Sequence, residues 1–369
     1  ERANALGLPL VVGFGLMDGY PEANRRHYAF MLEGLAEAAA DLEDRGIRFV
    51  VRHGSPEKVA LDLAGEAALV VCDRGYLRHQ RAWRRTVADG APCRVVQVES
   101  DVVVPVELAS QKAEFGARTI RPKIERVRDD FLVALDARPA AHPSLELAIE
   151  SDFDVREPLA TLDRLKLDES VDKVDRFKGG AGEARLRLER FIEDKLAGYA
   201  EGRNEPVARQ CSELSPYLHF GQIAPLDLAL AAKDAKGVGQ EDRASFLEEL
   251  IVRRELAVNF VTYTEDYDRF GMLPDWAQKT MREHDSGTGL VTCPGRYHAQ
   301  ETRLGFVGRP LPAMEEEDIH RRSLHRVLLK ELPDEVVGRD IEGRLAQPGQ
   351  GPLTPGPGMA AAVDRVEDH

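Results

Sequence analysis

Residues 212–223 read Ser-Glu-Leu-Ser-Pro-Tyr-Leu-His-Phe-Gly-Gln-Ile, and they predict the start of a short helix. Ser215 is expected to be the N-cap and Pro216 the first helical residue, where a missing N–H costs nothing. The free backbone N–H groups and the hydroxyls of Ser212 and Ser215 suit a phosphate or pyrophosphate. The same pattern is typical of an ordinary helix cap, so these residues alone leave both interpretations open.

Working outward, the length of 369 residues predicts two domains with sizeable cores. No apolar run approaches the roughly 20 residues that a membrane-spanning helix needs, so we expect no membrane association. The net charge of −14 argues against DNA binding through bulk electrostatics. Two arginine-rich runs, 74–85 and 117–128, are consistent either with a solvated surface or with a local basic face.

The four cysteines lie far apart and contain no Cys-x-x-Cys pair, which argues against structural zinc and for a reducing, cytoplasmic compartment. They are Cys72, Cys93, Cys211 and Cys293. No spacing of histidine and acidic residues predicts a metal site. The chain begins at Glu1 with neither Met nor a signal peptide, so we expect a truncated N-terminus.

The first part of the chain alternates strand and helix patterns. Leu8–Phe14 is a continuous apolar run of the kind found in buried parallel strands. Further strands are expected at 48–52, 68–72 and 94–98, with helices at 28–44, 57–63 and 78–88. This alternation predicts a Rossmann-like open parallel sheet. A dinucleotide fingerprint starting at Gly13 is rejected, because Gly19 comes one residue too late.

Later segments differ in character. Residues 119–175 are rich in charge and proline, with a short helix expected near 124–135. Helices are then expected at 183–198, 215–221, 225–235 and 245–263. We therefore expect an α/β domain over 1–118, a connector over 119–175 and a helical domain over 176–285. Residues 286–369 contain only two aromatic residues and end in Gly- and Pro-rich sequence, which predicts a weakly folded tail.

The helix expected at 245–263 carries charged residues beside its apolar side. Glu249, Arg253 and Leu256 share one stripe, on which the first two form an i,i+4 pair. As a surface ion pair it would contribute a few tenths of a kcal/mol. The string Tyr199-Ala-Glu-Gly-Arg-Asn-Glu-Pro206 is consistent with a plain helix end before proline.

Taken together, three strings resemble the photolyase/cryptochrome family, and specifically the class II cyclobutane pyrimidine dimer photolyases. They are residues 212–223, the Glu-Leu-Ile-x-Arg-x-Glu pattern at 249–255, and the Tyr-x-x-x-Arg-Asn-x-Pro pattern at 199–206. Similar class II-like strings occupy 14–24, 73–83 and 117–123. The resemblance covers roughly residues 5–285.

The resemblance implies a Rossmann-like α/β domain followed by an all-α flavin-binding domain. It implies light-driven repair of cyclobutane pyrimidine dimers by electron transfer from reduced FAD. Glu249 would hydrogen-bond the dimer, with Arg203, Asn204 and Arg253 on the substrate side. The residues implied to contact FAD are Tyr199, Ser212, Leu214, Ser215, Tyr217 and Leu218. An antenna chromophore of unknown identity, UV-damaged DNA as the partner, and a monomeric, nucleoid-associated cytoplasmic enzyme are also implied.

The resemblance fails at both ends of the chain. The family's first strand, before Leu8, is missing, and no Trp-Asn-Ala-Ala-Gln string follows Asp285. One hypothesis is a frameshift near residue 286. It would be excluded if no reading frame of the locus encoded such a string. Two alternatives to the enzyme therefore stay open: a degraded or frameshifted photolyase without full activity, and a flavin-binding, cryptochrome-like photosensor.

Overall fold

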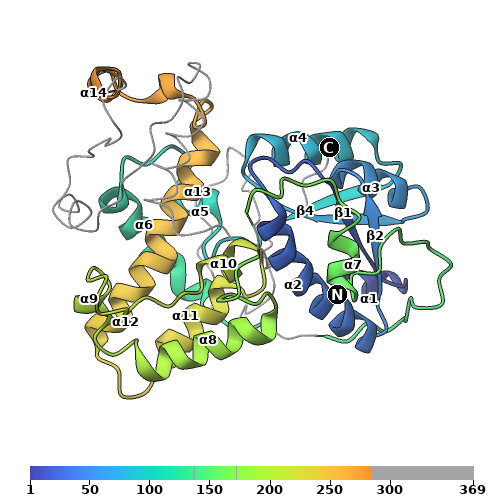
Figure 1. Cartoon of the computed structure of the whole chain (residues 1–369), viewed down its shortest axis with the longest axis horizontal. Coiled ribbons are helices and arrows are strands. Elements are labelled where there is room, and N and C mark those ends of the chain that lie inside the picture. The colour runs from blue at the N-terminus through green and yellow to red at the C-terminus, as the bar shows by residue number, and fades with distance from the viewer. Residues whose placement is uncertain (136–137, 172, 285–369) are drawn as a thin grey trace, which may run out of the picture.

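The computed structural model describes residues 1–135, 138–171 and 173–284. Figure 1 shows these residues as two parts that lie side by side, an α/β domain and a helical domain. The predicted combination of an N-terminal α/β domain and an all-α domain is confirmed. The predicted tail, 286–369, and Cys293 lie outside the described residues.

Four strands form the centre of the α/β domain, at β1 (Val11–Leu16), β2 (Arg48–His53), β3 (Leu69–Asp73) and β4 (Arg94–Val98). They make two parallel pairs, β1 with β2 and β3 with β4, instead of the single open sheet that was predicted. The helices of this domain are α1 (Arg2–Leu6), α2 (Arg25–Asp44), α3 (Pro56–Ala64) and α4 (Arg78–Gly90). Each strand pair is joined through a helix, as parallel pairing requires.

The α/β domain also holds chain from the interval expected to be a connector. Phe153, Val155 and Leu162 pack with Leu16 of β1 and Leu32 of α2 in one buried cluster. Short helix α7 (Pro158–Leu162) packs against α2. Apolar side chains from the proline-rich interval therefore complete a core instead of spanning a gap.

The helical domain surrounds a second, larger core. Its elements are α5 (Val106–Ala109), α6 (Ala117–Phe131), α8 (Ala181–Asp194), α9 (Tyr199–Gly202), α10 (Ser215–His219), α11 (Pro225–Asp234), α12 (Gln240–Leu247), the π-helix η1 (Glu248–Arg253), α13 (Arg254–Tyr263), the 3-10 turn η2 (Phe270–Met272) and α14 (Asp275–His284). Helix α6 belongs to this core through the fully buried Ile120 and Ile124. The long helix formed by α12, η1 and α13 runs through the domain (Figure 1).

Hydrogen bonds to backbone groups join the two domains. Glu33 and Glu37 of α2 accept hydrogen bonds from the N–H groups of Gly179 (2.6 Å) and Gly182 (2.7 Å). Gln222 of the helical domain donates from Nε2 to the Phe30 carbonyl oxygen of α2 at 3.1 Å. A Cβ at Gly179 would collide with a backbone carbonyl oxygen of α2. The glycines therefore permit the close approach of α2 to the start of α8.

Candidate functional site

Three of the sequence-predicted site residues meet in one cluster of the helical domain. Arg203 Nη1 lies 2.6 Å from Glu249 Oε1, and both side chains are a little over one quarter exposed. Tyr199 lies beside them, close enough for both charges to act on its phenol. Arg203 Nε is buried without a hydrogen-bond partner among the described residues. The cluster thus pairs a carboxylate with a guanidinium, an acceptor and a donor group that can each hydrogen-bond a ligand.

Tyr199 is held by aromatic packing. Its ring lies edge-on to Phe191 and Phe246, with centroid distances of 5.7 and 5.4 Å. Burial and the nearby Glu249 carboxylate raise the pKa of Tyr199 to about 12, although Arg203 opposes the shift. Tyr199 is therefore a neutral phenol throughout the physiological pH range.

Helix α9 supplies Tyr199 and leads into Arg203, and its start is held by a side chain of another helix. Asp242 of α12 accepts hydrogen bonds from the N–H groups of Gly198 (3.0 Å) and Ala200 (2.9 Å). Gly198 has φ +85°, a conformation that favours glycine. Asn204, predicted to face the substrate, is exposed at the end of this turn.

The loop 212–215 differs from its predicted geometry. Leu214 is the N-cap of α10, while Ser215 and Pro216 are its first two residues. The predicted N-cap at Ser215 is therefore wrong by one residue, because Leu214 already has helical dihedrals. Glu213 has φ +59°. A left-handed residue followed by a right-handed one makes a concave row of N–H groups that can bind an anion.

Other residues predicted to contact FAD belong to the core. Leu214, Tyr217 and Leu218 are almost fully buried in the helical domain. The Tyr217 hydroxyl donates to the Lys178 carbonyl oxygen (2.8 Å) and accepts from Arg187 Nε (2.9 Å). Contacts from these three residues to a ligand would have to come from their backbone. Ser212 and Ser215 are only partly buried.

Arg253 does not form the predicted i,i+4 pair with Glu249. Its Nε lies 3.2 Å from Glu248 Oε1, an i,i+5 spacing. Glu248 also accepts two hydrogen bonds from Arg121 of α6, at 2.9 and 2.6 Å. Residues 248–253 form a π-helix, whose hydrogen bonds span five residues instead of four. Because of the widened turn, Arg253 pairs with Glu248 and not with Glu249, the partner that regular helical spacing predicted.

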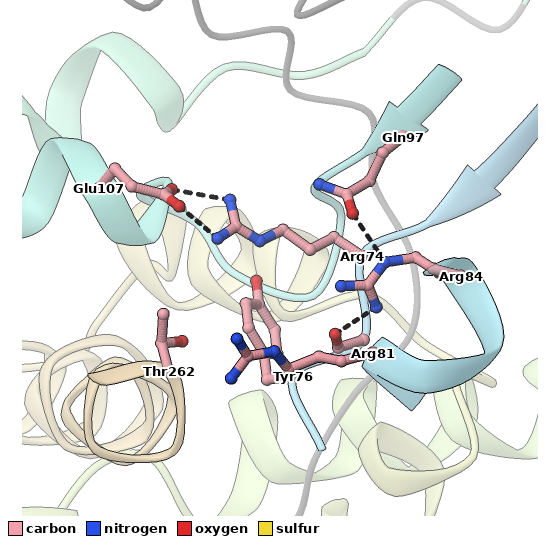
Figure 2. Close-up of a pocket in the computed structure, with 8 residues that line it drawn as sticks. Arg74, Tyr76, Arg81, Arg84, Gln97, Glu107 and Thr262 are labelled. Carbon is pink, nitrogen blue, oxygen red and sulfur yellow. Dashed lines mark hydrogen bonds and ion pairs between the residues drawn. The ribbon is translucent and has the colours of Figure 1, made fainter. Parts of the chain in front are cut away.

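A second polar site lies where the two domains meet. A cavity of about 230 Å³ is lined by residues of both domains: Arg74, Gly75, Tyr76, Arg81, Arg84, Gln97, Glu107 and Thr262. Figure 2 shows Arg74 bound to Glu107, and Arg84 bound to Gln97. Arg81 is exposed at this cavity. Arg74 is paired with Glu107 and lies 3.7 Å from Glu99, so the positive character of the cavity, which suits an anionic ligand, comes from Arg81 and Arg84.

Two buried acids beside this cavity were missed by the sequence reasoning. Glu99 accepts hydrogen bonds from the Tyr76 hydroxyl (2.6 Å) and from Val106 N–H (3.3 Å). Glu255 accepts from the N–H groups of Val103 (2.7 Å) and Val104 (3.0 Å). Burial raises the pKa of Glu99, and it raises that of Glu255 to about 8. Each acid has a single apolar neighbour in the sequence, Val98 or Leu256, and this is too weak a signal to predict burial.

Some functions find no support in the described part of the chain. Among these residues there is no group of three or more His, Cys, Asp or Glu arranged to hold a metal ion. The helices described here include none long and apolar enough to cross a membrane. Cys72, Cys93 and Cys211 are free thiols.

Comparisons with known proteins agree with this architecture. Residues 1–144 match the family model for DNA photolyase. The chain is 45% identical over 286 residues to a deoxyribodipyrimidine photo-lyase of Methanothermobacter thermautotrophicus, covering 77% of this chain and 61% of that protein. It is 35% identical over 281 residues to the photo-lyase of Potorous tridactylus, covering 75% and 52%.

Solved structures resemble the fold. A class III photolyase from Agrobacterium tumefaciens gives a TM-score of 0.57 at 22% identity, covering 72% of this chain and 56% of that one. A Synechocystis cryptochrome gives 0.60 at 17% identity, covering 72% and 58%. The chain thus spans between one half and two thirds of the length of these relatives. It belongs to the photolyase/cryptochrome family.

Proposed function

We propose that this protein repairs cyclobutane pyrimidine dimers in UV-damaged DNA, as a class II photolyase that uses light and reduced FAD. The observation that carries the proposal is the cluster of Tyr199, Arg203 and Glu249. The names of the two curated relatives, both deoxyribodipyrimidine photo-lyases, support the same reaction. We further propose that it acts as a monomer in the cytoplasm.

The chemistry of the cluster suits a pyrimidine dimer. A carboxylate such as Glu249 accepts a hydrogen bond from a ring N–H, and Arg203 can donate to a ring carbonyl oxygen. A positive guanidinium also stabilises negative charge that develops on the dimer. Flipping a damaged base into a cavity costs a few kcal/mol, less than flipping an intact one.

The residues of the 212–215 loop fit FAD through its phosphates. The left-handed conformation of Glu213 and the hydroxyls of Ser212 and Ser215 offer hydrogen-bond donors to an anion. Bound there, reduced FAD would supply the light-driven electron that opens the cyclobutane ring. The protein's part is to bind and orient the dimer and to exclude water from it. The neutral Tyr199 phenol can border such a site without adding charge.

The cavity at the domain junction supports a second ligand. An anionic antenna chromophore could bind between Arg81 and Arg84, close to the aromatic ring of Tyr76. An archaeal photolyase of similar fold, from Sulfolobus tokodaii, is described as carrying two FAD molecules, with the implication of a novel light-harvesting cofactor (TM-score 0.52, 17% identity). We propose an antenna chromophore of unassigned identity at this cavity.

The test is light-dependent repair of a dimer-containing oligonucleotide by the full chain reconstituted with FAD. The expected result is repair in the light, none in the dark, and a rate about tenfold lower for Glu249→Gln, which loses one charged hydrogen bond. Glu241→Gln, an exposed position on α12, serves as the matched control and should repair at the wild-type rate. Equal rates for both variants would remove Glu249 from the mechanism.

The same experiment separates the alternatives. A flavin absorbance spectrum without light-dependent repair would identify a cryptochrome-like photosensor. The absence of bound FAD after reconstitution would identify a degraded or frameshifted homologue without full activity. Either outcome would leave the membership in the family intact.

A further inference from the structure

The π-helix η1 (Glu248–Arg253) interrupts an otherwise regular helix formed by α12 and α13. Hydrogen bonds in a π-helix span five residues, and such turns are rare and concentrate at functional sites. The side chains show the same five-residue spacing: Arg253 Nε lies 3.2 Å from Glu248 Oε1. The widened turn is therefore matched by its own ion pair.

Two adjacent glutamates of this turn bind cations from different elements. Glu248 binds Arg121 of α6 through two hydrogen bonds in addition to Arg253. Glu249 binds Arg203, which follows α9. The hydrogen bonds from Arg121 lower the pKa of Glu248, so this carboxylate is ionised at neutral pH. One glutamate thus ties η1 to a neighbouring helix, while the next one reaches the site cluster.

We propose that the Arg121–Glu248–Arg253 triad is a positioning device, which holds the π turn so that Glu249 faces Arg203. This inference rests on the proposed function, in which Glu249 contacts the dimer. It reassigns Arg253, which the family resemblance placed on the substrate side, to a supporting role. Arg121 and Glu248 act through Glu249 and do not touch the substrate.

The geometry explains why a triad is needed. Arg121 Nε and Nη2 bind the two oxygens of Glu248 in the two-point arrangement that fixes orientation as well as distance. Glu248 is only about one fifth exposed, so water competes weakly for these contacts. Without the triad, the segment can return to regular α-helical hydrogen bonding, which would rotate Glu249 relative to Arg203.

Two measurements on the FAD-reconstituted full chain test the proposal. The first is amide hydrogen exchange in residues 249–254, which needs neither light nor DNA. Arg121→Leu should raise exchange there by about tenfold, as expected for the loss of a charged hydrogen bond. Arg121→Lys, which keeps the charge but can make only a one-point contact with Glu248, should give an increase smaller than that of Arg121→Leu. Arg156→Leu, an exposed ion-pair residue of the α/β domain, is the matched control and should change nothing in this segment.

The second measurement is the preference for a dimer-containing oligonucleotide over an undamaged one. Arg121→Leu should lose about tenfold of this preference, and adding Glu249→Gln to it should cause no further loss. Additive losses, or unchanged exchange in residues 249–254, would overturn the positioning role. If the wild type itself shows no preference, the proposed function fails, and the exchange rates still decide whether the triad holds the π turn.

Discussion

Glu255 provides the sharpest prediction for stability. This side chain is 3% exposed and accepts hydrogen bonds from the N–H groups of Val103 and Val104. Burial raises its pKa from 4.5 to about 8, although these hydrogen bonds and Arg254 oppose the shift. The folded chain therefore holds a proton on Glu255 at a pH where the unfolded chain has already lost it.

The sign and size of the effect follow from this difference. Because the pKa is raised on folding, the stabilising contribution is complete below pH 4.5 and is lost as the pH rises toward 8. The full loss is about 5 kcal/mol, from a shift of roughly 3.5 units at 1.36 kcal/mol each. Between pH 5 and 7 the loss amounts to about 2.5 kcal/mol.

Glu255→Gln tests this reasoning, since glutamine keeps an oxygen for both N–H groups but does not titrate. Urea unfolding of both proteins between pH 5 and 7 should show the variant gaining about 2.5 kcal/mol relative to the wild type. Glu43→Gln, an exposed carboxylate on α2, should follow the wild type at every pH. A difference between Glu255→Gln and the wild type that does not change with pH would refute the argument.

Three further substitutions probe the fold. Gly179→Ala should lower the free energy of unfolding by about 2–4 kcal/mol, because its Cβ collides with a carbonyl oxygen of α2; an unchanged urea midpoint would contradict this. Tyr217→Phe removes a hydroxyl with two hydrogen bonds and should cost about 1–2 kcal/mol by the same assay. Arg78→Leu breaks a half-exposed pair with Asp268 and should cost about 1 kcal/mol or less, with the cost shrinking at high salt when thermal unfolding is compared at two ionic strengths.

Local sequence patterns predicted most of the secondary structure. The strands at 48–52, 68–72 and 94–98 agree with β2, β3 and β4 to within one residue at either end. Short apolar runs bounded by turn residues carry that information in their own sequence. The pairing of the strands into two separate ladders depends on neighbours distant in the chain, and no local pattern encodes it.

The site was predicted in part. The resemblance identified Tyr199, Arg203 and Glu249, and the structure brings these three together. The sequence did not predict the π turn, because regular helical spacing pairs Glu249 with Arg253. The observed pairing of Glu248 with Arg121 and Arg253 involves a distant helix, which the local sequence does not indicate. Such tertiary contacts override local periodicity.

The acids at the domain junction illustrate the same limit. A lone glutamate beside apolar residues is usually exposed, and nothing in the sequence near Glu255 identifies the backbone groups of Val103 and Val104 as its partners. More than 140 residues separate donor and acceptor along the chain. Burial of this kind is a property of the assembled domains.

The contact between α2 and the start of α8 determines which substitutions this interface tolerates. Glu33 and Glu37 bind the main chain of Gly179 and Gly182, so recognition on the α8 side depends on backbone groups. A saturation library should therefore show an asymmetric interface. Substitutions at the two glutamates should lose these hydrogen bonds, whereas the chain entering α8 is constrained at Gly179 by space and at Gly180 also by its positive φ.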